Sequence, residues 1–357
     1  MKRPASVMLY LVRLLILGVG IGVMAGTLLS SWDPTSHSLD SSSKKATQSK
    51  AVQAASTPAD PSAPLPLSQL KLGQPMTSLA TEVQALAAKN TVLLPGVFFM
   101  DGDTGNYLDI NGTSTFAAAS MIKVPILVAF FQDVDAGKIR LDEKLTMRAD
   151  LIASGSGAMQ YQSPGTQYTA LETATQMIVI SDNTATNMLI ARMGGQDALN
   201  QRFQAWGLTS TVIRNALPDL EGTNTNSPKD LATLMYGVGQ GELVSLKSRD
   251  RLLHIMRQTV TDTLLPRGLG KGATISHKTG DIGSLVGDVG LVDMPNGKRY
   301  VAVAMVKRPH NDDRAQELIR QISKAAYKYL NRPTPAPATT PEPSPSPSPT
   351  PVVRPPA

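Results

Sequence analysis

The chain of 357 residues contains no cysteine, which excludes disulfide bonds, thiolate metal sites and a cysteine nucleophile. Aromatic residues make up only 4% of it, and the net charge of +6 forms no basic run interleaved with aromatics. We therefore expect no nucleic-acid partner. The four histidines are scattered, with no spacing such as His-Glu-x-x-His, so we expect neither a metal ion nor another cofactor.

The N-terminal segment, residues 1–32, contains a long apolar run. The run extends from Leu14 to Leu29 and follows three basic residues. About 20 apolar residues span a bilayer, and basic residues before such a segment keep the N-terminus in the cytoplasm. Residues 14–31 therefore predict a single membrane anchor. A signal peptide cleaved near Ala25-Gly26 is the alternative.

Composition separates the rest of the chain into a tether, a globular domain and a tail. Residues 33–73 are rich in Ser, Ala and Pro without apolar periodicity, which predicts a disordered tether. Residues 332–357 are Pro-rich and predict a second disordered segment. Residues 74–331 form the one globular region. With the anchor before it, we expect this region to be a monomeric domain in the periplasm or an equivalent extracytoplasmic space.

Periodicity within the globular region predicts strands at both ends and helices in the middle. Helices are expected at Thr77–Ala88 and at about Asp312–Leu330, each with one apolar face. The expected strands are Val97–Met100, Asn106–Ile110, Thr274–Thr279, Gly287–Val292 and Arg299–Val306. Ser227-Pro228-Lys229-Asp230 has the residues of a helix start. The fold class is therefore α+β: an antiparallel sheet flanked by the terminal helices, plus an all-helical lobe.

Ser120 and Lys123 are the first candidates for chemistry. Ser120-Met121-Ile122-Lys123 opens a predicted buried helix, and residues three apart share a helix face. A serine hydroxyl needs a nearby base to act as a nucleophile. A lysine in an apolar wall can be that base because desolvation lowers its pKa. The spacing alone is weak evidence, since Ser41 and Lys44 repeat it in the predicted tether.

Two further polar motifs follow in order along the chain. Ser181-Asp182-Asn183 precedes a predicted helix, and Lys278-Thr279-Gly280 ends a predicted strand. Each has a structural interpretation: the first as helix-capping residues, the second as an exposed strand end. The four-residue motif and these two together, in this order and context, resemble the penicillin-recognising serine hydrolases. This family includes class A β-lactamases and penicillin-binding proteins. The resemblance covers roughly Thr77 to Leu330 and implies the β-lactamase/transpeptidase-like fold.

The resemblance also implies roles for the residues of the three motifs. Ser120 would be the nucleophile that forms an acyl-enzyme, and Lys123 its base or proton relay. Ser181 would pass a proton to the leaving nitrogen. Asn183 would orient the substrate amide.

Substrate binding would depend on the third motif. Lys278 would supply positive potential, and Thr279 would bind the substrate carboxylate. The backbone N–H groups of Ser120 and Asp281 would form the oxyanion hole. An arginine soon after this motif, which many β-lactamases use to hold the carboxylate, is absent from residues 281–292.

The stretch after the second motif departs from the β-lactamase pattern. Class A β-lactamases carry there a glutamate that activates the deacylating water, soon after an arginine. Arg214 fits the arginine, but the glutamate position falls on Ala216 or Leu217, and counting from the second motif favours Leu217. Asp219 and Glu221 are candidates for the base only if the loop folds differently. The shorter loop without the glutamate is similar to that of cyanobacterial penicillin-binding relatives of class A enzymes.

Three functions remain open at this point. The resemblance to these relatives implies a penicillin-binding DD-carboxypeptidase that acts on D-Ala-D-Ala wall peptides and is acylated by β-lactams. The first alternative is a true β-lactamase that hydrolyses these antibiotics. The second alternative is a non-catalytic domain that binds peptidoglycan or β-lactam, although the intact Lys123, Ser181 and Lys278 oppose it.

Overall fold

The computed structural model describes residue 67 and residues 70–332. The predicted anchor at 14–31 lies outside these residues, as do nearly all of the predicted tether and tail. Within the described part, no helix is long and apolar enough to cross a membrane. Leu70–Gly73, assigned above to the tether, pack on the domain: Gly73 N donates to Gly105 O over 2.9 Å, and Leu70 is half-buried against the core. This contact is a backbone hydrogen bond to the residues just before β2 (Tyr107–Ile110), and the amino-acid composition of the segment does not predict it.

A five-stranded antiparallel sheet forms the centre of the domain, in the order β2-β1-β9-β8-β7. Its strands are β1 (Leu94–Asp101), β2 (Tyr107–Ile110), β7 (Thr274–Ile282), β8 (Leu285–Asp293) and β9 (Arg299–Lys307). The three longest strands are buried along almost their whole length, as expected for a sheet covered on both faces. β7 is an edge strand, so one side of its backbone is free to meet a ligand.

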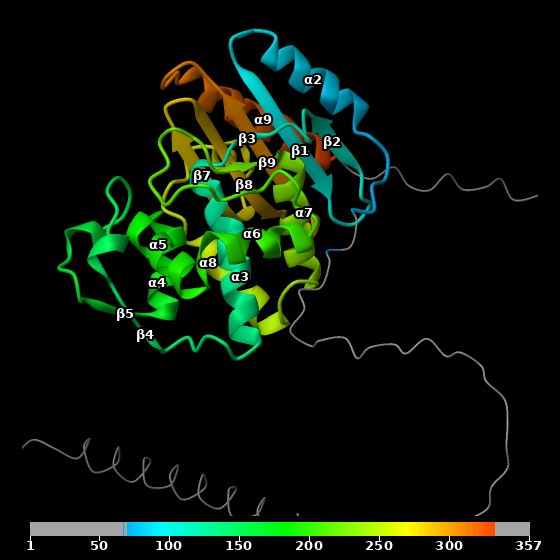
Figure 1. Cartoon of the computed structure of the whole chain (residues 1–357). Coiled ribbons are helices and arrows are strands. Elements are labelled where there is room, and N and C mark those ends of the chain that lie inside the picture. Colours follow the sequence, from blue (N-terminus) through cyan, green and yellow to red (C-terminus); the bar gives the residue numbers. More distant parts are fainter. Residues whose placement is uncertain (1–66, 68–69, 333–357) are drawn as a thin grey trace, which may run out of the picture. The chain divides into compact units, whose positions relative to one another are not determined.

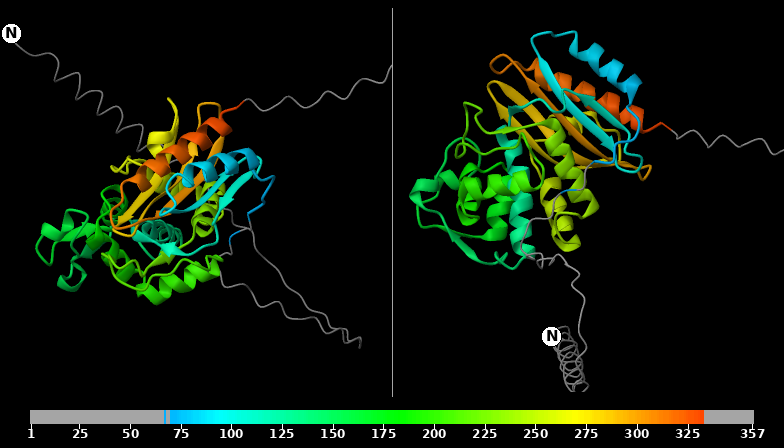
Figure 2. Two further views of the ribbon diagram at one scale, coloured as in Figure 1. Left: turned by 90° about the horizontal axis from the view of Figure 1, so that it is seen from above. Right: turned by 45° about the vertical axis from the view of Figure 1, so that its right-hand side comes forward.

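Two helices cover one face of the sheet, α2 (Thr77–Ala87) and α9 (Arg314–Leu330). They lie side by side across the strands (Figures 1 and 2). Their apolar stripes, including Leu79 and Val83 of α2 and Ile319 and Ile322 of α9, pack against the sheet in one core. Full burial of such a side chain contributes about 1.5–3 kcal/mol. The expectation of terminal helices on the sheet is confirmed.

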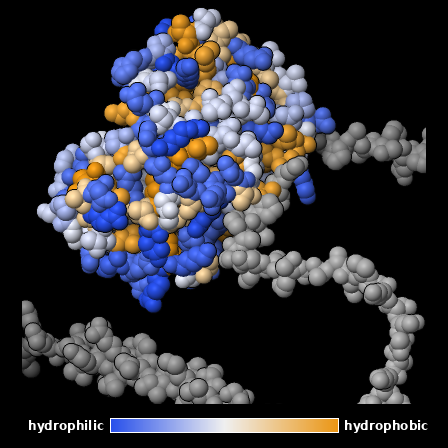
Figure 3. All heavy atoms as spheres, viewed as in Figure 1, coloured by the Kyte–Doolittle hydropathy of each residue, from blue (hydrophilic) through white to orange (hydrophobic). Residues whose placement is uncertain are grey.

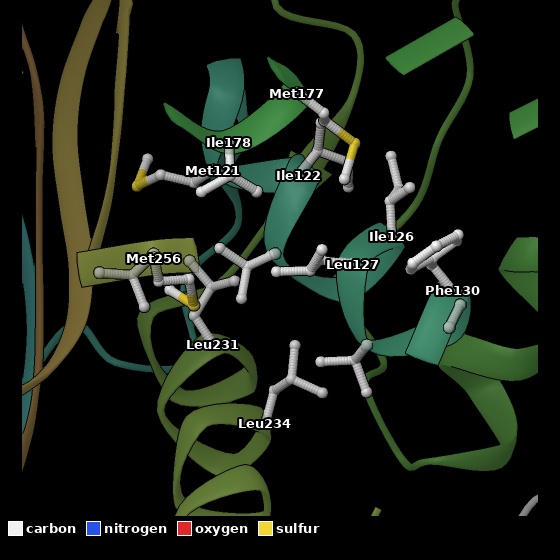
Figure 4. Close-up of a cluster of buried hydrophobic side chains, with 14 of the residues drawn as sticks. Met121, Ile122, Ile126, Leu127, Phe130, Met177, Ile178, Leu231, Leu234 and Met256 are labelled. Atoms are coloured by element: carbon white, nitrogen blue, oxygen red, sulfur yellow. The ribbon is translucent and has the colours of Figure 1, made fainter. Parts of the chain in front are cut away.

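The helical lobe lies on the other face. Its helices are α3 (Lys123–Asp135), α4 (Ala170–Val179), α5 (Asn183–Arg192), α6 (Gly195–Ala205), α7 (Pro228–Gln240) and α8 (Leu246–Arg257). α3 is buried on nearly every side because α4, α5, α6, α7 and α8 all pack against it. Figure 4 shows its Ile126, Leu127 and Phe130 in the second core, between side chains of α4, α7 and α8. The surface of the lobe in Figure 3 is mainly hydrophilic, with scattered apolar residues.

The middle of the chain is less purely helical than expected. Two small two-stranded sheets form there, β3 (Phe116–Ala117) with β6 (Thr225–Asn226), and β4 (Lys144–Thr146) with β5 (Gln167–Thr169). Four short 3₁₀ turns connect the elements: η1 (Ala119–Ile122), η2 (Ala149–Leu151), η3 (Met159–Tyr161) and η4 (Leu265–Gly268). Strands of two or three residues are too short for a period to be visible in the sequence. The fold class, α+β with an antiparallel sheet and a helical lobe, is confirmed.

Candidate active site

Ser120 lies at the junction of the sheet and the helical lobe, in η1. The prediction of an α-helix beginning at Ser120 is wrong in detail, because the turn is 3₁₀ and α3 begins at Lys123. The following Met121 and Ile122 point into the apolar core (Figure 4), which fixes the turn. The preceding Ala119 has φ +45°, a left-handed conformation that costs a non-glycine residue energy. Such strain is typical of functional sites, where the surrounding packing maintains it.

Lys123 and Ser181 form a hydrogen-bonded relay to the Ser120 hydroxyl. Ser181 Oγ lies 2.9 Å from Ser120 Oγ, and Lys123 Nζ lies 3.1 Å from Ser181 Oγ. Lys123 Nζ also donates to Ser181 O over 2.6 Å and to Asn183 Oδ1 over 2.8 Å. No direct hydrogen bond between Lys123 and Ser120 occurs in the described structure. The base therefore reaches the nucleophile through Ser181, which sequence spacing does not suggest.

The surroundings of Lys123 prepare it to accept a proton. Burial lowers the pKa of its ammonium well below the ordinary value, and the positive charge of Lys278 lowers it further, although Asp182 opposes both effects. The neutral amine has a lone pair that can take a proton from Ser181. Because hydroxyl hydrogens rotate, Ser181 can in turn accept the proton of Ser120 as the nucleophile attacks.

The second motif both caps a helix and builds the site. Asp182 is the N-cap of α5 and accepts from Ala185 N over 2.8 Å, so the capping interpretation is also correct. The same carboxylate accepts from Met159 N over 2.9 Å and holds the loop that borders the site. Ser181 adopts φ +58°, a left-handed conformation directly before the N-cap of α5. Asn183 donates to Ser154 O over 2.9 Å while its oxygen binds Lys123.

The third motif brings the free edge of β7 against the nucleophile. A Cβ on Gly280 would lie 3.0 Å from Ala119 Cβ and 3.1 Å from Ser120 N, so any larger residue would crowd the nucleophile here. Lys278 is buried and donates to Thr279 O over 2.8 Å. Burial lowers the pKa of Lys278 to about 8, with Asp288 opposing the shift. Lys278 makes no hydrogen bond to Ser181 within the described residues.

Two buried partners of this strand escaped the sequence analysis. His277 lies 3.0 Å from Asp288 through its Nδ1, and both side chains are buried. Arg308, after β9, donates to the Asp281 carboxylate and to Ile282 O. These pairs follow from strand register, which no local motif encodes. Among the described residues, no cluster of three or more carboxylate or imidazole groups is placed to hold a metal ion.

Comparison with known proteins decides the family. The Beta-lactamase enzyme family matches residues 78–330. The chain belongs to this family. The solved structure of PBP-A is 60% identical, with a TM-score of 0.72, and covers 73% of this chain and 99% of PBP-A. A leucine-to-glutamate variant of PBP-A, solved as an acyl-enzyme with penicillin G, matches equally well. The β-lactamase VEB-1 of Pseudomonas aeruginosa is 25% identical over 68% of this chain and 87% of its own.

Membership of the β-lactamase family makes the chain a serine hydrolase. The resemblance inferred from the motifs is confirmed, as is the β-lactamase/transpeptidase-like fold. Ser120, Lys123, Ser181, Asn183 and Lys278 come together from α3 and its η1 turn, the α5 start and β7. The individual roles, including the oxyanion hole of Ser120 N and Asp281 N, are the assignments that the family chemistry implies.

Leu217, predicted to stand at the position of the deacylating glutamate, lies in a loop beside the site. Leu217 is buried, and Asn187 fixes its backbone: Leu217 N donates to Asn187 Oδ1 over 3.0 Å, and Asn187 Nδ2 donates to Leu217 O over 2.9 Å. Asn187 lies one turn along α5 from Asn183, which binds Lys123. A Cβ on Gly155 would contact both Asn183 and Pro218, so the Leu217-Pro218 segment borders the site.

Neither acid of this loop can replace the glutamate in this conformation. The buried Asp219 accepts from Thr223 Oγ1 over 2.9 Å and from Asn224 N over 2.6 Å, and so closes the loop. Glu221 is exposed and lines a separate pocket. The sequence analysis did not identify Asn187, which fixes the Leu217 backbone. Its position four residues after Asn183 was the available signal, since residues i and i+4 share a helix face.

Proposed function

We propose that this chain is a penicillin-binding DD-carboxypeptidase that forms an acyl-enzyme at Ser120 and releases β-lactams slowly. One feature supports this choice over a true β-lactamase: Leu217, which we assign to the position of the deacylating base, is held by two hydrogen bonds with Asn187. A leucine cannot accept a proton from water, and its apolar side chain opposes placement of that water. The 60% identity with PBP-A supports the same choice.

Acylation would follow from the relay already present. Ser120 Oγ attacks the carbonyl carbon of the scissile amide, and its proton passes through Ser181 toward the neutral Lys123 amine. The N–H groups of Ser120 and Asp281 would stabilise the oxyanion; one such donor contributes about 10²–10³ in rate. Ser181 would then protonate the leaving nitrogen. The charged Lys278 and the Thr279 hydroxyl would bind the carboxylate beside that nitrogen, which both penicillin and a terminal D-alanine carry.

The substrate class we propose is the stem peptide of peptidoglycan, with β-lactams as mimics that block the site. Consistent with this substrate, we propose that residues 14–31 hold the domain at the outer surface of the cytoplasmic membrane. Wall peptides are exposed there, and a Ser120-acylating domain would meet them without leaving the membrane.

The decisive experiment measures three reactions on one preparation. We expect release of D-alanine from an acyl-D-Ala-D-Ala peptide, stable labelling of Ser120 by a fluorescent penicillin, and only slow turnover of nitrocefin. Ser120→Ala should lose all three, and a mass shift should locate the label on the Ser120 peptide. Fast, sustained nitrocefin hydrolysis with no D-alanine release would instead establish a β-lactamase. Binding without covalent labelling would establish a non-catalytic domain.

A further inference from the structure

A second pocket, of about 480 Å³, lies at one end of the sheet. We call it the end pocket. Its floor is formed where β1 and β8 begin and β9 ends, and there Leu94 and Leu285 both pair with Lys307. The loop between β2 and β3 forms one wall. Asn111 fixes this loop by donating to Pro95 O over 2.9 Å, so the wall is preformed.

The end pocket lies beside the segments that carry the nucleophile and the end of β7. Ala117 of β3 lines it and lies three residues before Ser120. Gly222 also lines it, and a Cβ there would lie 2.8 Å from Ala117 Cβ and 3.1 Å from Ile282 Cδ1. Ser284, in the turn after β7, completes this side. A ligand that follows the free edge of β7 from Lys278 past Ile282 therefore arrives at the end pocket.

Two opposite charges face this pocket without partners. Glu221 from the loop and Lys307 from the end of β9 both line it. Among the described residues, neither makes an ion pair or a side-chain hydrogen bond. Hydroxyl groups of Ser114, Thr115 and Ser284 add neutral hydrogen-bonding groups. Glu221 can pair with an ammonium and Lys307 with a carboxylate, so the lining suits best a ligand that carries both charges.

We propose that the end pocket binds the acyl-side residue of the peptide substrate, and that it selects a side chain ending in both an ammonium and a carboxylate. Glu221 would bind the ammonium and Lys307 the carboxylate. This inference rests on the proposed function, since the substrate direction along β7 follows from placing its terminal carboxylate at Lys278 and Thr279. The acyl side then extends past Ile282 to the end pocket.

The test compares three peptides that differ only in the residue before D-Ala-D-Ala. Its side chain ends in an ammonium and a carboxylate in the diaminopimelyl peptide, in an ammonium alone in the lysyl peptide, and in a methyl group in the norleucyl peptide. We expect kcat/KM for D-alanine release to fall in that order. Each step should be about fivefold, the upper end for a solvent-exposed charge pair.

Two variants assign the charges separately. Lys307→Met should abolish the difference between the diaminopimelyl and lysyl peptides, and Glu221→Gln should abolish that between the lysyl and norleucyl peptides. Both should keep the wild-type rate of Ser120 acylation by a small β-lactam without an acyl side chain. Glu82→Gln and Lys328→Met, exposed residues of α2 and α9 that do not line the end pocket, are the matched controls and should keep all preferences.

The outcomes separate the pocket from the proposed function. Equal kcat/KM for the three peptides, with Ser120 still acylated by the small β-lactam, would overturn the end-pocket proposal alone. Calorimetric binding of the same peptides to Ser120→Ala repeats the comparison without turnover. An affinity in that variant that depends on the charges of the peptide would support the end-pocket proposal. It would do so even if the wild-type protein released no D-alanine and the proposed function were therefore wrong. Equal affinities would reject the pocket.

Discussion

Replacing Leu217 by glutamate should convert slow release of the penicilloyl group into turnover. In the structure Asn187 holds the Leu217 backbone with hydrogen bonds of 3.0 and 2.9 Å, next to the helix turn that carries Asn183. The backbone of a glutamate at this position would be held beside the site by the same hydrogen bonds. The glutamate would supply the general base that we infer is missing from deacylation.

The structure limits how large this gain will be. General-base catalysis contributes about 10²–10⁴ in rate when the base is well placed. Leu217 is only 6% exposed, so the new carboxylate would be desolvated and its pKa raised, and part of it would be protonated at neutral pH. We therefore expect about 10²-fold faster deacylation, the lower end of the range. Replacing a buried apolar side chain by a polar one should also lower stability by about 1–3 kcal/mol.

The assay follows the acyl-enzyme itself. Protein acylated with penicillin G is separated from free antibiotic, and the decay of the penicilloyl mass on the Ser120 peptide is measured over time. Leu217→Gln is the matched control because glutamine has the shape of glutamate but cannot act as a base. Its acyl-enzyme should decay at the wild-type rate. Adding Asn187→Ala to Leu217→Glu should reverse most of the gain, since the backbone clamp is lost.

Two results would refute this reasoning. Equal acceleration by Leu217→Gln and Leu217→Glu would mean that loosening the loop, rather than a base, speeds release. Rapid hydrolysis of penicillin by the unmodified protein, without accumulation of acyl-enzyme, would show that Leu217 does not limit deacylation. Asp219 and Glu221 would then become the candidates for the base, in a loop conformation other than the one described.

The remaining predictions concern proton transfer, the oxyanion hole and the anchor. The acylation rate should rise with pH as Lys123, whose pKa is lowered, loses its proton. It should fall near pH 8 as Lys278 loses its charge, and Lys278→Arg should shift this fall to higher pH in the rate profile. Gly280→Ala should slow acylation by about 10²-fold in stopped-flow labelling, because the added Cβ would move β7 away from Ser120 N. An unchanged rate would argue against the assigned oxyanion hole. Cell fractionation should retain the protein in membranes through residues 14–31, with the domain open to external protease, whereas a soluble mature form would indicate a cleaved signal peptide.

Local sequence patterns determined most of the secondary structure. Ser227 caps α7 with Pro228 in the first turn, as its residue types predict, and its side chain accepts from Asp230 N. The strands from Thr274, Gly287 and Arg299 are present and somewhat longer than predicted. The three motifs also identified the family without any tertiary information. These signals are readable because capping, turn formation and strand patterning depend on residues only a few positions apart.

Only the tertiary structure decided how the site works. Ser181 bridges Lys123 to Ser120 across 61 residues of sequence, Asn187 fixes Leu217 across 30, and Arg308 meets Asp281 across 27. A side chain at position 280 is disfavoured because β7 lies against Ser120 N. That Glu221 and Lys307 line the same pocket likewise depends on the tertiary structure. Each contact joins segments that approach one another only when the two cores have packed. No local pattern of residues predicts which distant segments will meet.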